Sequence, residues 1–135
     1  MSPTVTGAAE WNALFGHLAR WLGNLRRAGR ARKLESKRAL RDVVGAVRRT
    51  TVLLHAAEQG RVTAADRAEL AERWTELGFR LEDLGLSKLA KRCEIRGRHG
   101  AEPDRFDADF LERADIQLER IETLARLTLR ELDRT

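Results

Sequence analysis

Two segments rich in arginine and lysine are the residues of this chain most able to do chemistry. Residues 26–41 contain Glu35 as their one acid, and residues 88–98 contain Glu94 as theirs. Guanidinium groups bind phosphate through parallel hydrogen bonds, so both segments are suited to an anion. Neither contains an aromatic side chain for base stacking, which predicts contacts to backbone phosphates with little reading of sequence. The candidate anion-binding residues are Arg26, Arg27, Arg30, Arg32, Lys33, Lys37, Arg38, Lys88, Lys91, Arg92, Arg96 and Arg98.

The net charge of +5 is unevenly distributed along the chain. Residues 1–62 contain 12 Lys or Arg and 4 Asp or Glu, whereas residues 63–135 contain 14 and 17. This asymmetry indicates an anionic partner, or contact between the basic half of one copy and the acidic half of another. Three environments for the basic segments stay open: a nucleic acid, an acidic protein, and water alone. The last fits because Arg outnumbers Lys 22 to 4, as a coding bias toward arginine would produce.

The other reactive residue types do not form a catalytic or metal-binding pattern. His17, His55 and His99 lie in three different segments, and none belongs to a spacing typical of di-iron or zinc sites. Cys93 is the only cysteine and fits a small buried residue better than a reactive thiol. The three aspartates between residues 104 and 109 lack calcium-loop spacing and fit helix capping. We therefore expect no catalytic residue, no metal, no cofactor and no enzymatic activity.

The elements that position the basic segments are expected to be helices. Four stretches carry apolar residues at helical spacing, near residues 8–28, 33–58, 64–84 and 108–132. Strand-forming residues are sparse, so the sequence predicts an all-α protein, an up-down four-helix bundle. A short extra helix at about 88–96 is expected in the connection between the third and fourth helices. Residues 1–6 are expected to form a flexible N-terminal tail and residues 7–135 a single helical-bundle domain.

Glycines and a capping pair mark the expected helix ends. The glycines are Gly29, Gly60, Gly85 and, after the short extra helix, Gly97. Thr63, followed three residues later by Asp66, predicts a capped helix start. Residues 97–106 are expected to form a loop. In this up-down arrangement the first and third connections lie at one end, so the two basic segments are expected to form one basic pole.

Several apolar residues lie off the stripes that face the expected core. The stripes include Leu40, Val43, Val47 and Leu54 in the second stretch, and Leu70, Trp74, Leu77 and Leu81 in the third. The off-stripe residues, which are candidates for a partner interface, are Trp21, Val52, Leu53, Phe79, Ile116 and Leu127. Off-stripe apolar residues on all four helices favour a second contact surface. The alternative is that the connection 85–106 folds back over Phe79.

Two functions fit these observations. The first is a non-catalytic adaptor or regulatory protein that acts through protein–protein contacts and self-associates as a homo-oligomer. The alternative is a protein that binds nucleic acid or phosphate through the basic pole. A lone cysteine, the lack of a signal peptide and the lack of an apolar run of roughly 18 residues predict a cytoplasmic protein without membrane contact.

Overall fold

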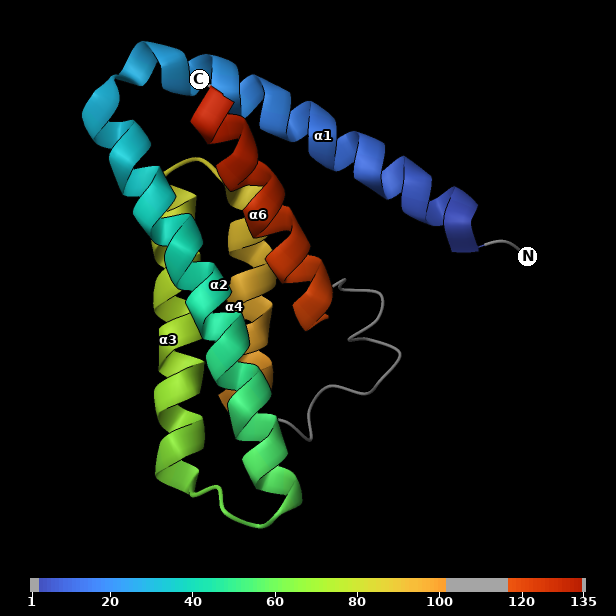
Figure 1. Cartoon of the computed structure of the whole chain (residues 1–135), viewed down its shortest axis with the longest axis vertical. Helices are drawn as coiled ribbons and strands as arrows, with labels where there is room; N and C mark the ends of the chain where they lie inside the picture. The colour runs from blue at the N-terminus through green and yellow to red at the C-terminus, as the bar shows by residue number, and fades with distance from the viewer. Residues whose placement is uncertain (1–2, 102–116, 135) are drawn as a thin grey trace.

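The computed structural model describes residues 3–101 and 117–134 of the chain. Within these residues there are five helices and no strand, so the predicted all-α class is confirmed (Figure 1). The helices are α1 Pro3–Ala28, α2 Arg30–Glu58, α3 Ala64–Asp83, α4 Ser87–Ala101 and α6 Leu118–Arg134. None of them has both the length and the apolar character that crossing a membrane requires.

Most of the expected helix boundaries are found. Gly29, Gly60 and Gly85 have φ values of 93°, 68° and 84°, in the left-handed region that glycine adopts without steric cost. Thr63 Oγ1 accepts a hydrogen bond from the Asp66 amide, and the Asp66 carboxylate accepts one from the Thr63 amide, both at 3.1 Å. At the N-terminus, helix already begins at Pro3, inside the segment for which the sequence predicted a tail.

The arrangement of the helices differs from the predicted one. Figure 1 shows α2, α3, α4 and α6 alongside one another, whereas α1 lies across one end of this group and extends beyond it. The expected bundle used residues 8–28 as one of its four members. In the structure α4 takes that place, because its Leu89, Ala90 and Cys93 are buried in the shared core.

Gly97 does not end α4, contrary to the prediction, and the helix continues to Ala101. Gly97 instead lies against α3, where an added Cβ would collide with the Thr75 hydroxyl and lie 3.0 Å from the Ala71 carbonyl oxygen. A Cβ on Gly100 would lie 3.3 Å from the Ala71 Cβ. These glycines therefore allow two helices to approach closely, and the predicted loop 97–106 is wrong for residues 97–101. Residues 102–106 lie outside the described residues.

The direction of the C-terminal helix also follows from α4. Because α4 leads the chain back toward the far end, α6 runs the opposite way to the last helix of the predicted bundle. Its C-terminal end lies beside the start of α2, where Lys37 Nζ and Asp133 Oδ1 are 2.7 Å apart. The structure thus brings the last turn of α6 to the end where α1 meets α2 (Figure 1).

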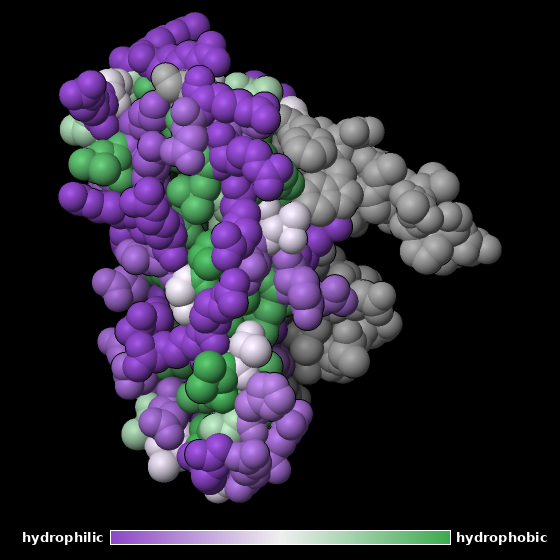
Figure 2. Space-filling view, viewed as in Figure 1, coloured by the Kyte–Doolittle hydropathy of each residue, from purple (hydrophilic) through white to green (hydrophobic). Residues whose placement is uncertain are grey.

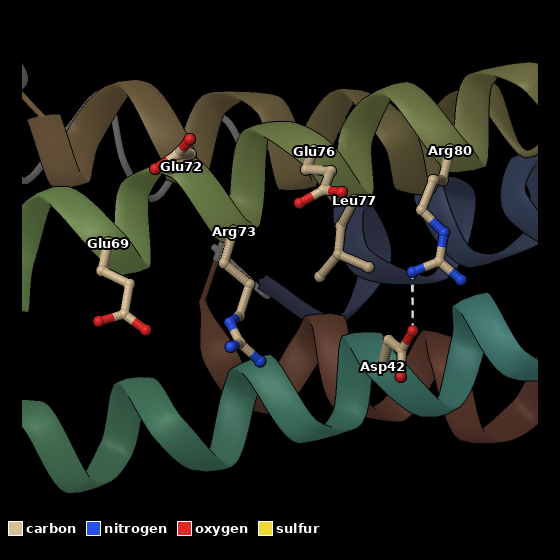
Figure 3. Close-up of a pocket in the computed structure, with 7 residues that line it drawn as sticks. All are labelled: Asp42, Glu69, Glu72, Arg73, Glu76, Leu77 and Arg80. Carbon is tan, nitrogen blue, oxygen red and sulfur yellow. Dashed lines mark hydrogen bonds and ion pairs between the residues drawn. The ribbon is translucent and has the colours of Figure 1, made fainter.

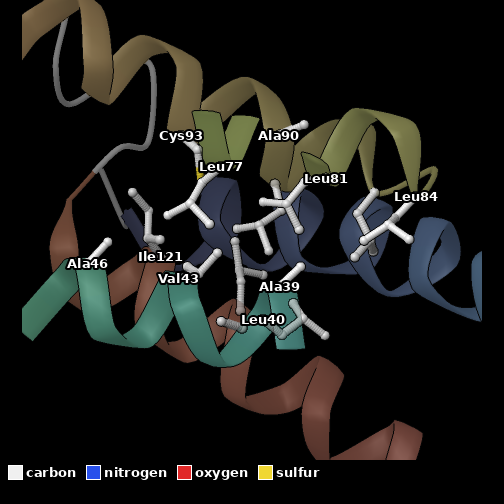
Figure 4. Packing of buried hydrophobic residues seen from close by; sticks show 14 of the residues in the cluster. Ala39, Leu40, Val43, Ala46, Leu77, Leu81, Leu84, Ala90, Cys93 and Ile121 are labelled. Atoms are coloured by element: carbon white, nitrogen blue, oxygen red, sulfur yellow. The ribbon is translucent and has the colours of Figure 1, made fainter. Parts of the chain in front are cut away.

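The core lies between the four adjacent helices. Figure 4 shows Leu40 and Val43 of α2, Leu81 of α3 and Ile121 of α6 packed together, and all four are fully buried. The buried Trp74 indole N–H donates to Thr50 Oγ1 at 2.9 Å, so its polar atom is satisfied inside the core. The expected stripe of α2 is wrong in its last turns, where Leu54 is 49% exposed and Leu53 packs against the core instead.

Candidate functional site

The connections that carry the basic segments are joined by two hydrogen bonds. Arg32 Nη2 donates to the Asp83 carbonyl oxygen at 3.0 Å, and the Trp21 indole N–H donates to the Leu84 carbonyl oxygen at 2.8 Å. These bonds attach the α1–α2 corner to the turn between α3 and α4. The two connections therefore lie at the same end of the molecule, as the sequence predicts.

Ten of the twelve predicted cations belong to helical segments that begin or end at this end of the molecule. We call these ten side chains the basic end: Arg26, Arg27, Arg30, Arg32, Lys33, Lys37, Arg38, Lys88, Lys91 and Arg92. Figure 2 shows hydrophilic side chains covering this part of the molecule.

Arg96 and Arg98 lie away from the basic end. They lie on the later turns of α4, which puts them roughly 12–15 Å farther along the helix than Lys88. Arg98 Nη2 is 3.1 Å from Glu94 Oε1, and burial lowers the pKa of Arg96, opposed by the charge of Glu119. The prediction that these two arginines share one pole with the others is wrong, because residues 88–98 form a long helix and not a connection.

Two arginines along the sides of the molecule are paired with carboxylates across the α2–α3 groove. Arg80 Nη1 lies 2.7 Å from Asp42 Oδ2, in the groove between α2 and α3 (Figure 3). Farther along the same two helices, Arg49 Nη2 lies 3.6 Å from Glu69 Oε1. These two pairs link α2 to α3.

The arginines of the α1–α2 corner have no such partners. Arg26, Arg27, Arg30 and Arg38 are exposed, and no ion pair joins any of them to another residue in the part of the chain that the structure describes. Lys37 differs from them because it pairs with Asp133, a residue that sequence reasoning placed at the opposite end. An excess of unpaired positive charge therefore remains at the corner.

The start of α2 adds to this excess. Its first turn contains Arg30, Arg32 and Lys33 and no acid, and its N-cap, Gly29, provides no side-chain hydrogen bond. A helix N-terminus already carries partial positive charge, so cations in the first turn are unfavourable there. An anion at this position would relieve that repulsion.

His17 is a neighbour of the basic end that the sequence did not single out for this role. Burial lowers its pKa, and the charges of Lys88 and Arg20 lower it further. Its Nε2 atom is buried without a hydrogen-bond partner in the structure described. Both burial and the nearby charges of Lys88 on α4 and Arg20 on α1 therefore disfavour the protonated imidazole.

The cysteine and the metal-binding residue types were also located in the structure. Cys93 is buried in the core, and burial raises the pKa of its thiol to about 12. Across residues 3–101 and 117–134, no three His, Cys, Asp or Glu side chains are grouped so as to hold a metal ion. What the described arrangement offers is electrostatic attraction and hydrogen-bond donors for an anion.

Trp21 is not available to a partner, contrary to the prediction. It is only 6% exposed, and its indole N–H is bonded to the turn after α3. The residue lies at the edge of the apolar stripe of α1, and this edge faces the rest of the molecule because α1 crosses the end instead of running alongside. Trp21 therefore fixes the α1–α2 corner in place.

The remaining interface candidates do not form one patch. Val52 and Phe79 are 69% and 63% exposed, Leu53 and Leu127 are partly buried, and Ile116 lies outside the described residues. The ion pairs Asp42–Arg80 and Arg49–Glu69 show which turns of α2 and α3 lie side by side. Along the helix axis, Val52 of α2 lies about ten residues, or roughly 15 Å, from the turn of α2 that is beside Phe79. The fold-back of the connection over Phe79 is wrong for the described residues, because Phe79 stays exposed although α4 packs on α3.

Comparison of the chain with known proteins finds no family model that matches it, and no similar curated protein or solved structure.

Proposed function

We propose that this protein binds polyanions at its basic end and that the ligand is a nucleic acid held by its backbone phosphates. The observation that carries the proposal is the concentration of positive charge at the α1–α2 corner, where four exposed arginines lie outside any ion pair among the described residues and the first turn of α2 contains no acid. Arginine is well suited to such contacts because its guanidinium binds phosphate oxygens in pairs.

Duplex backbone fits this surface better than single strands. Single-strand binding depends on aromatic side chains on which bases stack. Trp21, the aromatic residue nearest the corner, is buried and hydrogen-bonded to the Leu84 carbonyl oxygen. Binding is therefore proposed to be insensitive to sequence and strongly dependent on salt.

Fluorescence anisotropy with labelled duplex DNA and duplex RNA tests this proposal. We expect the logarithm of affinity to fall linearly with the logarithm of salt concentration, by about 0.9 for each phosphate neutralised. Arg26→Glu with Arg27→Glu should weaken binding to all sequences alike. Arg61→Glu with Arg67→Glu provides the matched control, since these residues lie at and beside the α2–α3 connection, at the far end. Equal losses in the two variants, or no binding at low salt, would refute a localised site.

A second proposed function is that of an adaptor or regulatory protein that self-associates. It is supported by the large apolar side chains of Phe79 on α3 and Leu34 on α2, which are 63% and 45% exposed. The single cysteine, which excludes an internal disulfide, fits our proposal of a cytoplasmic location.

A further inference from the structure

Two exposed stripes of opposite charge run along the outer faces of α2 and α3. The stripe of α2 consists of Arg30, Leu34, Arg38 and Arg41, and the stripe of α3 consists of Glu72, Glu76, Phe79 and Asp83. All eight side chains are exposed, and Leu34 and Phe79 are 45% and 63% exposed. Each stripe thus has three charges of one sign and one large apolar residue.

The carboxylates of the acidic stripe have no cationic partner among the described residues. No ion pair involving Glu72, Glu76 or the Asp83 carboxylate occurs in residues 3–101 and 117–134. In Figure 3, Glu72 points away from α2, whereas Arg80 on the same helix reaches across to Asp42. Of the two α3 arginines in this view, Arg80 has a carboxylate partner on α2, whereas the carboxylates of Glu72 and Glu76 have no cationic partner among the described residues.

The two stripes match when they are aligned antiparallel. Along α2 the intervals between stripe residues are 4, 4 and 3, and along α3 read backwards from Asp83 they are 4, 3 and 4. The first and last residues of each stripe are 11 positions apart, or roughly 16 Å along the helix. The alignment sets Arg30 against Asp83, Leu34 against Phe79, Arg38 against Glu76 and Arg41 against Glu72, with no position displaced by more than one residue.

We propose that a second copy of this chain docks the α3 stripe onto the α2 stripe in this antiparallel register. The occupant is a second copy because each chain carries both halves of the match, in charge and in spacing. The contact joins unlike surfaces, so one copy presents its α2 stripe where its neighbour presents its α3 stripe. Leu34 and Phe79 form the apolar centre of the contact, and the ion pairs around them set register and direction.

Charge exchange between two variants tests the proposal. Wild-type protein should sediment above monomer mass at low salt and dissociate as salt is raised, because the ion pairs at the rim are screened. Arg38→Glu with Arg41→Glu should be monomeric alone, and Glu72→Arg with Glu76→Arg should also be monomeric alone. An equimolar mixture of the two variants should associate again at wild-type concentration, because the reversed α2 stripe of one faces the reversed α3 stripe of the other.

Each outcome is decisive. A wild type that is monomeric at high concentration and low salt overturns the proposal, and so does a mixture that stays monomeric while wild type associates. Recovery in the mixture shows that both variants are folded and that the partner is this chain and not another protein. The Arg61→Glu with Arg67→Glu control should associate as wild type does. The Glu72→Arg with Glu76→Arg variant should still bind nucleic acid, because its basic end is intact, so failure here is separable from failure of the polyanion proposal.

Discussion

A pair of glycine substitutions tests the close approach of α3 and α4. Gly97 and Gly45 are both helical glycines, but their surroundings differ. A Cβ on Gly97 would collide with the Thr75 hydroxyl and lie 3.0 Å from the Ala71 carbonyl oxygen, whereas a Cβ on Gly45 meets nothing within 4 Å. The same change to alanine should therefore have opposite effects at the two positions.

The magnitudes follow from two opposing contributions. Glycine to alanine within a helix lowers the free energy of the folded state by about 0.5–1 kcal/mol through conformational entropy. At Gly45 this gain should appear in full. At Gly97 the methyl group forces α3 and α4 apart, and overpacking of this kind costs about 1–3 kcal/mol. We expect Gly97→Ala to lose about 1 kcal/mol net.

Urea denaturation followed by far-ultraviolet circular dichroism measures both changes. If the slope of the free energy against urea is unchanged, the shift in midpoint gives the difference in stability. Gly97→Val should lose more than Gly97→Ala, since its larger side chain meets the same backbone atoms. Stabilisation by Gly97→Ala equal to that by Gly45→Ala would show that residue 97 faces open space and that α4 does not pack on α3 as described.

Three further predictions concern the core and the ionisable groups. Ile121→Ala should lower the free energy of unfolding by about 2–5 kcal/mol through lost burial and a cavity, measured by the same urea titration, and a loss below about 0.5 kcal/mol would contradict its central position. Cys93, whose pKa is raised by burial to about 12, should resist thiol reagents at neutral pH in the folded protein and react once unfolded; rapid native labelling would show an exposed thiol. Asp66 and Asp133 have pKa values below their ordinary 3.8, because hydrogen bonds from Thr63 and Lys37 stabilise the charged carboxylates. The stabilisation that these two carboxylates add to the free energy of unfolding should be complete above pH 3.8 and be lost as pH falls through their lowered pKa values. Lys37→Met removes the partner of Asp133, so the stability of this variant should depend less on pH below 3.8 than that of wild type, as measured by acid unfolding.

Local patterns in the sequence predicted the helices and several of their ends. The stripe through Leu77 and Leu81 gave a buried face of α3, because apolar residues at three- and four-residue spacing line one side of a helix. Thr63 and Asp66 were identified as a cap because that interaction is complete within four residues. Such features depend on neighbours in the chain and are readable without knowledge of the fold.

The packing of the helices depends on contacts that no local pattern contains. Gly97 is typical of a helix end when read alone, and its role became evident only with Thr75 and Ala71 beside it. Gly97 and Gly100 both lie against Ala71 of α3, and the sequence near the two glycines does not name that partner. Because Gly97 was interpreted as a helix end, the predicted helix at 88–96 was too short to be a member of the bundle. The predicted direction of the last helix was wrong for the same reason.

The position of the basic end was predictable only in part, because some of its residues lie near short connections and others depend on how the helices pack. The α1–α2 corner and the α3–α4 turn are short, so their placement at one end follows from connection lengths alone. Arg96 and Arg98 were misplaced because they depend on how far α4 extends. Asp133 was missed because its position depends on the direction of α6, and it neutralises Lys37 at one side of the site.

The two proposed contacts share side chains, and this sharing links them. Arg30 and Arg38 belong both to the basic end and to the α2 stripe, so neither arginine can bind a phosphate and a carboxylate of a second copy fully at once. By thermodynamic linkage, if a bound polyanion lowers the affinity of one copy for another, then self-association lowers the affinity for the polyanion by the same factor. Arg26 and Arg27 lie outside the α2 stripe and remain available to phosphate in either state. Because of this division, an oligomer would keep part of its affinity for nucleic acid while losing the contributions of Arg30 and Arg38. Self-association would therefore tune how tightly the basic end binds without removing binding.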